Sequence, residues 1–260
     1  MTSRGSLFLD RPQAPAPAWA KALTSIGLFA IFSLVCWSIL SSSSRSLQIL
    51  QEYREVFIRG WLLTVAISAA ALCLSIAIGL LAALAKKSQI IVIRYLSISY
   101  IEIVRGMPFL VLILILWFGI VPITQFGNRM FFGVLALSLF SGAYLAEMIR
   151  AGVESVGASQ LESARAIGLT GFQTYRYVIF PQALRHTLPA LTGQFASLIK
   201  DSSLLSVIGL SEFTFSAQQV FNATYSTMES FLPLGVGYLI LTVPVSFWTK
   251  SLEKRLRYET

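Results

Sequence analysis

The sequence predicts an all-α integral membrane protein with about six transmembrane helices. Of its 260 residues, 55% are hydrophobic and 12% are charged, and the mean hydropathy is +0.72. Soluble domains carry about 25% charged residues, so this chain has too little charge to cover a soluble globule. Apolar runs near the ~20 residues that a spanning helix needs recur along the chain. These observations exclude a soluble enzyme, a disordered chain and a secreted disulfide scaffold.

Each expected span is an apolar run of about the thickness of a bilayer core. The runs are residues 22–40, 61–85, 95–121, 131–149, 188–210 and 231–248. Pro108 is expected to break the third run, because proline lacks a backbone donor. Lys200 and Asp201 interrupt the fifth run. The first run is expected to be retained, since it is longer than the roughly 7–15 apolar residues of a signal peptide.

Lysine and arginine residues set the expected orientation and domains. With the amino terminus inside, 14 of the 20 fall on cytoplasmic segments and four on outer segments. Cytoplasmic loops are enriched in these residues, so both termini are expected in the cytoplasm. Residues 1–21 are Pro/Ala-rich in part and are expected to form a mobile cytoplasmic tail. Residues 22–40 would form an extra N-terminal transmembrane helix, and residues 57–252 the main transmembrane domain.

The long cytoplasmic loop 150–186 is the main polar segment expected on the inner side. Residues 153–167 favour a helix and Gly168 breaks the pattern. A second helix is expected to begin near Thr170 and to be stopped by Pro181. The residues alone leave two interpretations open. The loop is either a surface amphipathic hairpin or an element that transmits a push from a cytoplasmic partner to the adjoining spans.

Several motifs resemble those of ABC importer permeases for polar amino acids. The loop pattern EAA-x3-G-x9-I-x-L-P of that family is matched without a gap by Glu162-Ser163-Ala164, Gly168 and Val178-Ile179-Phe180-Pro181. Its departures, at Ser163, Val178 and Phe180, are conservative. Residues 143–155 resemble the AAYxAExxRxGxxS element of the family. Its RGTP element is resembled by Arg105-Gly106-Met107-Pro108, and its KxSSL element by Lys200-Asp201-Ser202-Ser203-Leu204. The resemblance covers about residues 59–250.

The resemblance implies a type I ABC importer permease (MetI-like) fold with one extra N-terminal helix, in the bacterial inner (cytoplasmic) membrane. It implies two ABC ATPase subunits, a second permease subunit in a homodimer or heterodimer, and an extracytoplasmic amino acid-binding protein. The implied ATPase-coupling residues are Glu162, Ala164, Arg165, Gly168 and Pro181. Arg165 and Arg176 are equally consistent with anchoring in the inner leaflet. The chain is expected to bind no cofactor and to have no catalytic residue, with ATP and Mg on the partner ATPase subunits.

Ionisable side chains within spans form the candidate substrate pathway. Such groups cost at least ~2.5–3.5 kcal/mol on insertion scales, so they normally face protein, water or a partner. The candidates are Glu102, Arg105, Lys200, Asp201, Ser202 and Ser203. An ion pair between Glu102 and Arg105, three residues apart, is an equal alternative, and helix–helix hydrogen bonding is the alternative around Asp201. Glu147 and Arg150 are expected to form an interfacial salt bridge.

The leading hypothesis is an ATP-driven importer of polar amino acids or close derivatives. The main alternative is a secondary, proton-coupled carrier, which would use Glu102, Glu147 or Asp201 as a proton relay and would not need the loop. An intramembrane enzyme or a metal site is disfavoured, because the chain has a single histidine, His186, at a membrane edge. No GxxxxGK phosphate loop occurs. The net charge of +8 is attributed to basic cytoplasmic loops rather than to nucleic-acid binding, and the expected surroundings are membrane lipid. The amino acid, the make-up of the dimer and the location of the substrate site stay open.

Overall fold

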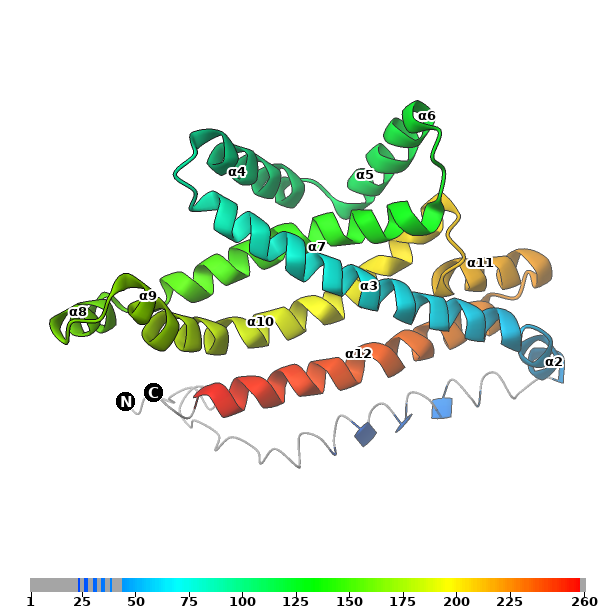
Figure 1. Ribbon diagram of the computed structural model, residues 1–260. Coiled ribbons are helices and arrows are strands. Elements are labelled where there is room, and N and C mark those ends of the chain that lie inside the picture. The colour runs from blue at the N-terminus through cyan, green and yellow to red at the C-terminus, as the bar shows by residue number, and fades with distance from the viewer. Residues whose placement is uncertain are drawn as a thin grey trace, which may run out of the picture.

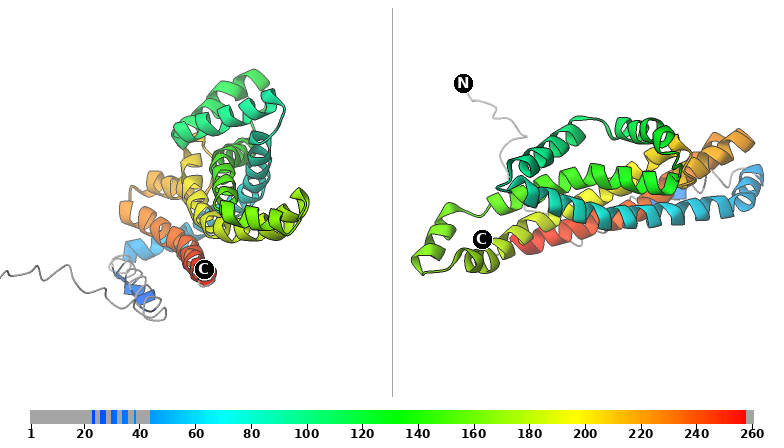
Figure 2. Two further views of the ribbon diagram at one scale, coloured as in Figure 1. Left: turned by 90° about the vertical axis from the view of Figure 1, so that its left-hand side faces the viewer. Right: turned by 45° about the horizontal axis from the view of Figure 1, so that its top comes forward.

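The structure, a computed structural model, describes residues 44–257 and scattered positions between 23 and 38. Four long helices lie lengthwise beside one another (Figure 1): α3 (Arg54–Lys86), α7 (Arg129–Glu154), α10 (Phe180–Asp201) and α12 (Thr227–Arg257). One side of this bundle carries α4 (Ile91–Gly106), α5 (Phe109–Leu114) and α6 (Val121–Thr124) (Figure 2). The ends of the bundle carry α2 (Ser44–Glu52), α8 (Ala158–Ala166), α9 (Gly171–Thr174) and α11 (Phe213–Thr224).

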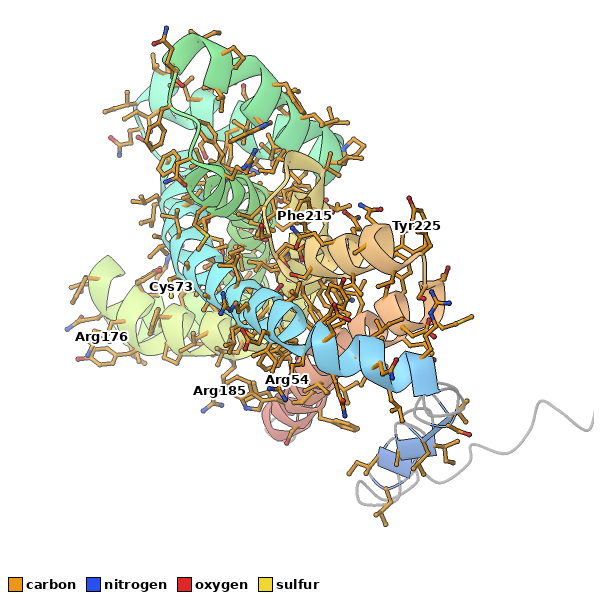
Figure 3. All side chains as sticks on the ribbon, turned by 90° about the vertical axis from the view of Figure 1, so that its right-hand side faces the viewer. Arg54, Cys73, Arg176, Arg185, Phe215 and Tyr225 are labelled. Carbon is orange, nitrogen blue, oxygen red and sulfur yellow. The ribbon has the colours of Figure 1, made fainter. Side chains whose placement is uncertain are left out.

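The two ends of the bundle differ in character. At one end, α8 and α9 project beyond the long helices, and at the other end lie α2 and α11 (Figure 1). Tyr225 marks the tip of α11, whereas Arg176 follows α9 (Figure 3). The predicted inner loop therefore forms one pole of the molecule.

Small residues let α3 and α7 pack closely. A Cβ atom on Gly79 would lie 2.7 Å from Leu145 Cβ and 3.0 Å from the Gly142 carbonyl oxygen. The Ser138 hydroxyl of α7 donates a hydrogen bond to the Ala71 carbonyl of α3 at 3.3 Å. Transmembrane helices associate through van der Waals packing and interhelical hydrogen bonds rather than through removal of apolar surface from water. This close contact therefore positions α7, the helix that α8 and α9 follow in the chain.

The structure agrees with most of the expected spans. Within the described residues, α3, α7 and residues Thr227–Thr249 of α12 are long and apolar enough to cross a membrane. The break expected at Pro108 is confirmed, because α4 and the α5–α6 segment form a further apolar pair bent by 113°. The tail 1–21 lies outside the described residues, as does the extra helix 22–40 except at scattered positions.

Pro181 does not end a helix, and this prediction is wrong. A π-helical turn, Tyr175–Ile179, leads directly into α10, which begins at Phe180 with Pro181 in its first turn. The helical path is continuous through this point, and the Phe180 amide donates to the Tyr175 carbonyl in the wider π pattern, so the missing amide of Pro181 coincides with a local change of helix type rather than with an end. The expected span 188–210 is also displaced. Its α-helix begins earlier, ends at Asp201 and continues as a 3₁₀ helix, Ser202–Ile208.

Two helices, α2 and α11, were not expected from the sequence. Both are too short, at 9 and 12 residues, to satisfy the pattern of a spanning helix. They are stabilised by tertiary packing: Ile49 of α2 and Phe213, Ala217 and Val220 of α11 are buried in one apolar cluster with Phe57 of α3.

Candidate functional site

The α8–α9 segment (residues 155–179) contains a tightly specified turn at Gly168. The Gly168 amide donates to the Arg165 carbonyl and the Leu169 amide to the Ala164 carbonyl, each at 3.0 Å. This pair of bonds is a Schellman motif, which needs a left-handed residue after the helix. Gly168 has a φ of +79°, which confirms its expected role in the turn. No atom lies within 4 Å of the position a Cβ would take, so the turn requires glycine for its backbone conformation.

A capping box fixes the start of α9. The Thr170 hydroxyl accepts from the Gln173 amide at 3.3 Å, and the Gln173 side-chain oxygen accepts from the Thr170 amide at 2.8 Å. Two amides at the helix start are thereby satisfied. The connection between α8 and α9 is thus ordered from both sides rather than being a loose loop.

The α8–α9 segment presents mixed side chains to its surroundings. Ala164 is buried, whereas Glu162 and Arg165 are exposed. Ile167 and Phe172 are each 76% exposed. Large exposed apolar side chains beside charged ones are typical of an interaction surface. The segment is therefore an ordered element that projects beyond the long helices and is suited to docking on another protein (Figure 1).

The α8–α9 segment is joined firmly to two long helices. Its first residue follows the end of α7 at Glu154, and its π-helical turn, Tyr175–Ile179, leads directly into α10. Near this end, a Cβ on Gly152 of α7 would lie 3.0 Å from the Ala183 carbonyl oxygen of α10 and would collide with the Thr187 hydroxyl. Because the two helices touch through backbone here, a displacement of the segment moves both of them.

The predicted pathway residues form two groups at different heights along the bundle. The Asp201 group comprises Lys200, Asp201, Ser202 and Ser203, and the Arg105 group comprises Glu102 and Arg105. The Gln194 side-chain amide of α10 lies 3.5 Å from the Ser141 hydroxyl of α7, which defines how the two antiparallel helices are aligned. Asp201 lies seven residues beyond Gln194, and Glu147, which holds Arg105, lies six residues beyond Ser141 in the opposite direction. At 1.5 Å per residue, the two groups are about 20 Å apart along the bundle. Within the described residues, no hydrogen bond or ion pair links them.

The Asp201 group lies where α10 ends and the 3₁₀ helix begins. Lys200 is exposed and Asp201 and Ser203 are half-buried. Ser202 is fully buried, and its hydroxyl donates to the Ile199 carbonyl at 2.7 Å. Lys200 and Asp201 therefore offer opposite charges at adjacent positions, whereas Ser202 serves its own helix.

Glu212 is a buried acidic residue that the sequence analysis missed. It is fully buried and accepts hydrogen bonds from the amides of Thr214 at 2.9 Å and Phe215 at 2.8 Å and from the Tyr238 hydroxyl at 3.1 Å. It thereby caps α11 and connects the end of the 3₁₀ helix to α12. Glutamate is not among the residues usually found at an N-cap, so no standard helix-start signal marks Glu212 in the sequence.

The Arg105 group is arranged around the Glu147 carboxylate. Arg105 lies 3.6 Å from the Glu147 carboxylate, so the ion pair considered between Arg105 and Glu102 does not form; Glu102 is exposed on α4. The expected pair between Glu147 and Arg150 is present at 2.8 Å. Lys86 is a third partner, at 2.6 Å.

Comparison with known protein sequences identifies the family. The family described as "Binding-protein-dependent transport system inner membrane component" matches residues 75–258. The glutamine transport system permease protein GlnP of Escherichia coli (strain K12) is 34% identical over 205 residues, which are 78% of this chain and 93% of that protein. The probable glutamine ABC transporter permease protein GlnM of Bacillus subtilis (strain 168) is 31% identical, over 81% of this chain and 98% of that protein.

Comparison with solved structures agrees. A chain from the crystal structure of an amino acid ABC transporter with histidines is 35% identical, with a TM-score of 0.75 over 79% of this chain and 96% of that chain. A chain of the MetNI methionine ABC transporter, at 18% identity and a TM-score of 0.65 over 78% of this chain and 97% of that chain, shares the fold. The chain described here therefore belongs to the family of binding-protein-dependent transport system inner membrane components, the multi-pass permeases of ABC transporters.

Proposed function

We propose that this chain is the permease subunit of an ATP-driven importer that carries polar amino acids or close derivatives into the cytoplasm. The observation that carries the proposal is the 34% identity to a glutamine transport permease over 78% of the chain. A nopaline transport permease of Agrobacterium fabrum, 36% identical over 63% of this chain and 72% of that protein, supports the wider class of amino acid derivatives.

In the proposed transporter, the α8–α9 segment is the coupling element. Glu162 makes charge-assisted contacts to an ATPase subunit, Ala164 allows close approach, and Gly168 shapes the turn. Arg165 adds a contact at the same surface, and Pro181 lies in the first turn of the helix that carries the movement onward. ATP and Mg are bound and ATP is hydrolysed by two partner ATPase subunits, and this chain binds no cofactor of its own.

The proposed assembly contains a second permease subunit and a binding protein on the outer face. Both termini and the α8–α9 segment face the cytoplasm, which is supported by the 14 of 20 Lys and Arg residues that this orientation places inside. The permease domain, residues 57–252, supplies half of the pathway. Lys200, Asp201 and Ser203 form its polar lining, whereas the buried Ser202 hydroxyl is used within its own helix. The adjacent opposite charges of Lys200 and Asp201 suit the ammonium and carboxylate groups of an amino acid. Glu102 and Arg105 contribute at a second level of the pathway.

Reconstitution tests this proposal. The permease, its ATPase and its binding protein are placed in proteoliposomes and supplied with a panel of radiolabelled L-amino acids that includes glutamine, arginine and histidine. We expect uptake of at least one polar amino acid that requires ATP, the ATPase and the binding protein. Uptake that proceeds without the ATPase and collapses with the proton gradient would instead establish a proton-coupled carrier and overturn the proposal.

A further inference from the structure

The geometry points to Glu147 as a positioning residue that couples the α8–α9 segment to the break between α4 and α5. We propose that its carboxylate holds the arginine next to this break against the helix that leads into the α8–α9 segment. The inference rests on the proposed function, because it concerns how a push on that segment reaches the membrane pathway.

One face of α7 contacts residues on both sides of the break between α4 and α5. Phe140, Tyr144 and Glu147 are spaced four and three residues apart, so they lie on the same helical face. After the break, the Phe109 ring of α5 packs on Phe140 with centroids 4.8 Å apart. Before the break, the Arg105 guanidinium lies 5.5 Å from the Tyr144 ring centroid and 3.6 Å from the Glu147 carboxylate. The two halves of the bent span thus meet on α7 (Figure 1).

Glu147 is also the shared anion of three helices. Lys86 ends α3, Arg105 is the last but one residue of α4, and Arg150 lies one turn further along α7. Their nitrogens lie 2.6, 3.6 and 2.8 Å from the Glu147 oxygens. The Glu147 side chain is 15% exposed, whereas those of Lys86, Arg105 and Arg150 are 27%, 42% and 35% exposed, so the carboxylate is the most enclosed member of the cluster. Arg150 also binds Glu154, at the end of α7 and next to the α8–α9 segment.

The contact can be removed without detaching α4. The Ser97 hydroxyl donates to the Ala82 carbonyl and the Tyr100 hydroxyl to the Leu139 carbonyl, each at 2.7 Å. Ile101 packs in an apolar cluster with residues of α3 and α7. These neutral contacts stay when the carboxylate is replaced, so a Glu147→Gln protein keeps α4 in place but loses the charge that holds Arg105.

The test measures uptake per ATP hydrolysed in proteoliposomes that contain permease, ATPase and binding protein, with the amino acid that the wild type takes up. We expect Glu147→Gln to lower this ratio about tenfold, a typical size for coupling between two sites, while the amount of assembled complex stays at the wild-type level. Glu154→Gln is the matched control: it removes a carboxylate from the same helix that also binds Arg150 but touches neither Lys86 nor Arg105, and its ratio should match wild type.

A double-mutant cycle with Arg105→Gln separates coupling from direct substrate contact. If Arg105 acts through Glu147, the double variant should be no worse than Glu147→Gln alone. Fully additive losses would overturn the proposal, as would a normal ratio in Glu147→Gln or a loss of uptake that only tracks loss of complex. A wild-type complex that shows no ATP-driven uptake would refute the proposed function instead, so the two failures are distinguishable.

Discussion

Replacing Gly168 by valine tests whether the turn after α8 depends on backbone conformation. Gly168 has a φ of +79° and is the pivot of two hydrogen bonds, to the carbonyls of Arg165 and Ala164 from its own amide and that of Leu169. A β-branched side chain in this left-handed region costs about 1–2 kcal/mol. No atom lies within 4 Å of the added Cβ, so packing contributes nothing to this cost and the strain alone is measured.

Amide hydrogen exchange is the direct assay. If the Leu169 amide exchanges through local opening of the turn, destabilisation by about 1–2 kcal/mol speeds its exchange about 5- to 30-fold. The affinity of the ATPase for the permease should fall only to the extent that the closed turn ceases to be the dominant state of the free segment, because docking requires the closed turn. Both measurements use the full-length permease in detergent or nanodiscs.

Two further variants make this prediction refutable. Gly171 also has open space around its Cβ position but begins α9 with no positive φ. Valine is slightly more favourable than glycine in a helix, so Gly171→Val should not speed exchange. Gly168→Asn should fall between, since asparagine tolerates the left-handed region. Equal exchange in the two valine variants would show that the φ of Gly168 is not what stabilises the turn.

Three more predictions concern the bundle and the pathway. Gly79→Val should destabilise the α3–α7 contact by about 1–3 kcal/mol through overpacking and lower the midpoint of thermal unfolding in detergent, whereas Gly193→Val, with no atom near its Cβ position, should not; equal shifts would contradict the packing. Glu212→Ala should leave two amides of α11 unpaired at a cost of about 1–3 kcal/mol and speed hydrogen exchange of residues 213–224, with Glu212→Gln milder; unchanged exchange would refute the cap. Asp201→Ala should raise the KM for uptake more than it alters assembly, and unchanged uptake and selectivity would remove Asp201 from the pathway.

Local features of the fold could be predicted from the sequence. The apolar runs identified α3, α7 and α12, because crossing a membrane demands length and hydropathy that composition records directly. The break at Pro108 and the turn at Gly168 were also predicted, since each depends on the backbone chemistry of one residue. Pro181 shows the limit of this reasoning, because the helical path continues through it by way of the π-helical turn Tyr175–Ile179, which the sequence around the proline does not reveal.

The candidate site was predicted only in part. The α8–α9 segment was found from its motif spacing, and the charges within spans were found because they are rare there. The short helix α11 and its cap Glu212 were missed, because α11 is stabilised by packing on α3 and α12 rather than by its own length.

The order of the spans, their expected orientation and the position of the loop follow from the chain read in one dimension, because hydropathy, basic residues and glycine act locally. Charge pairing does not follow from it. Lys86, Arg105 and Glu147 are far apart in sequence and come together because small residues bring α3 and α7 close and α4 is packed across both. Arg105 therefore takes Glu147 as its partner rather than Glu102, which is three residues away. Electrostatic partners depend on distances in space, and helix packing sets those distances.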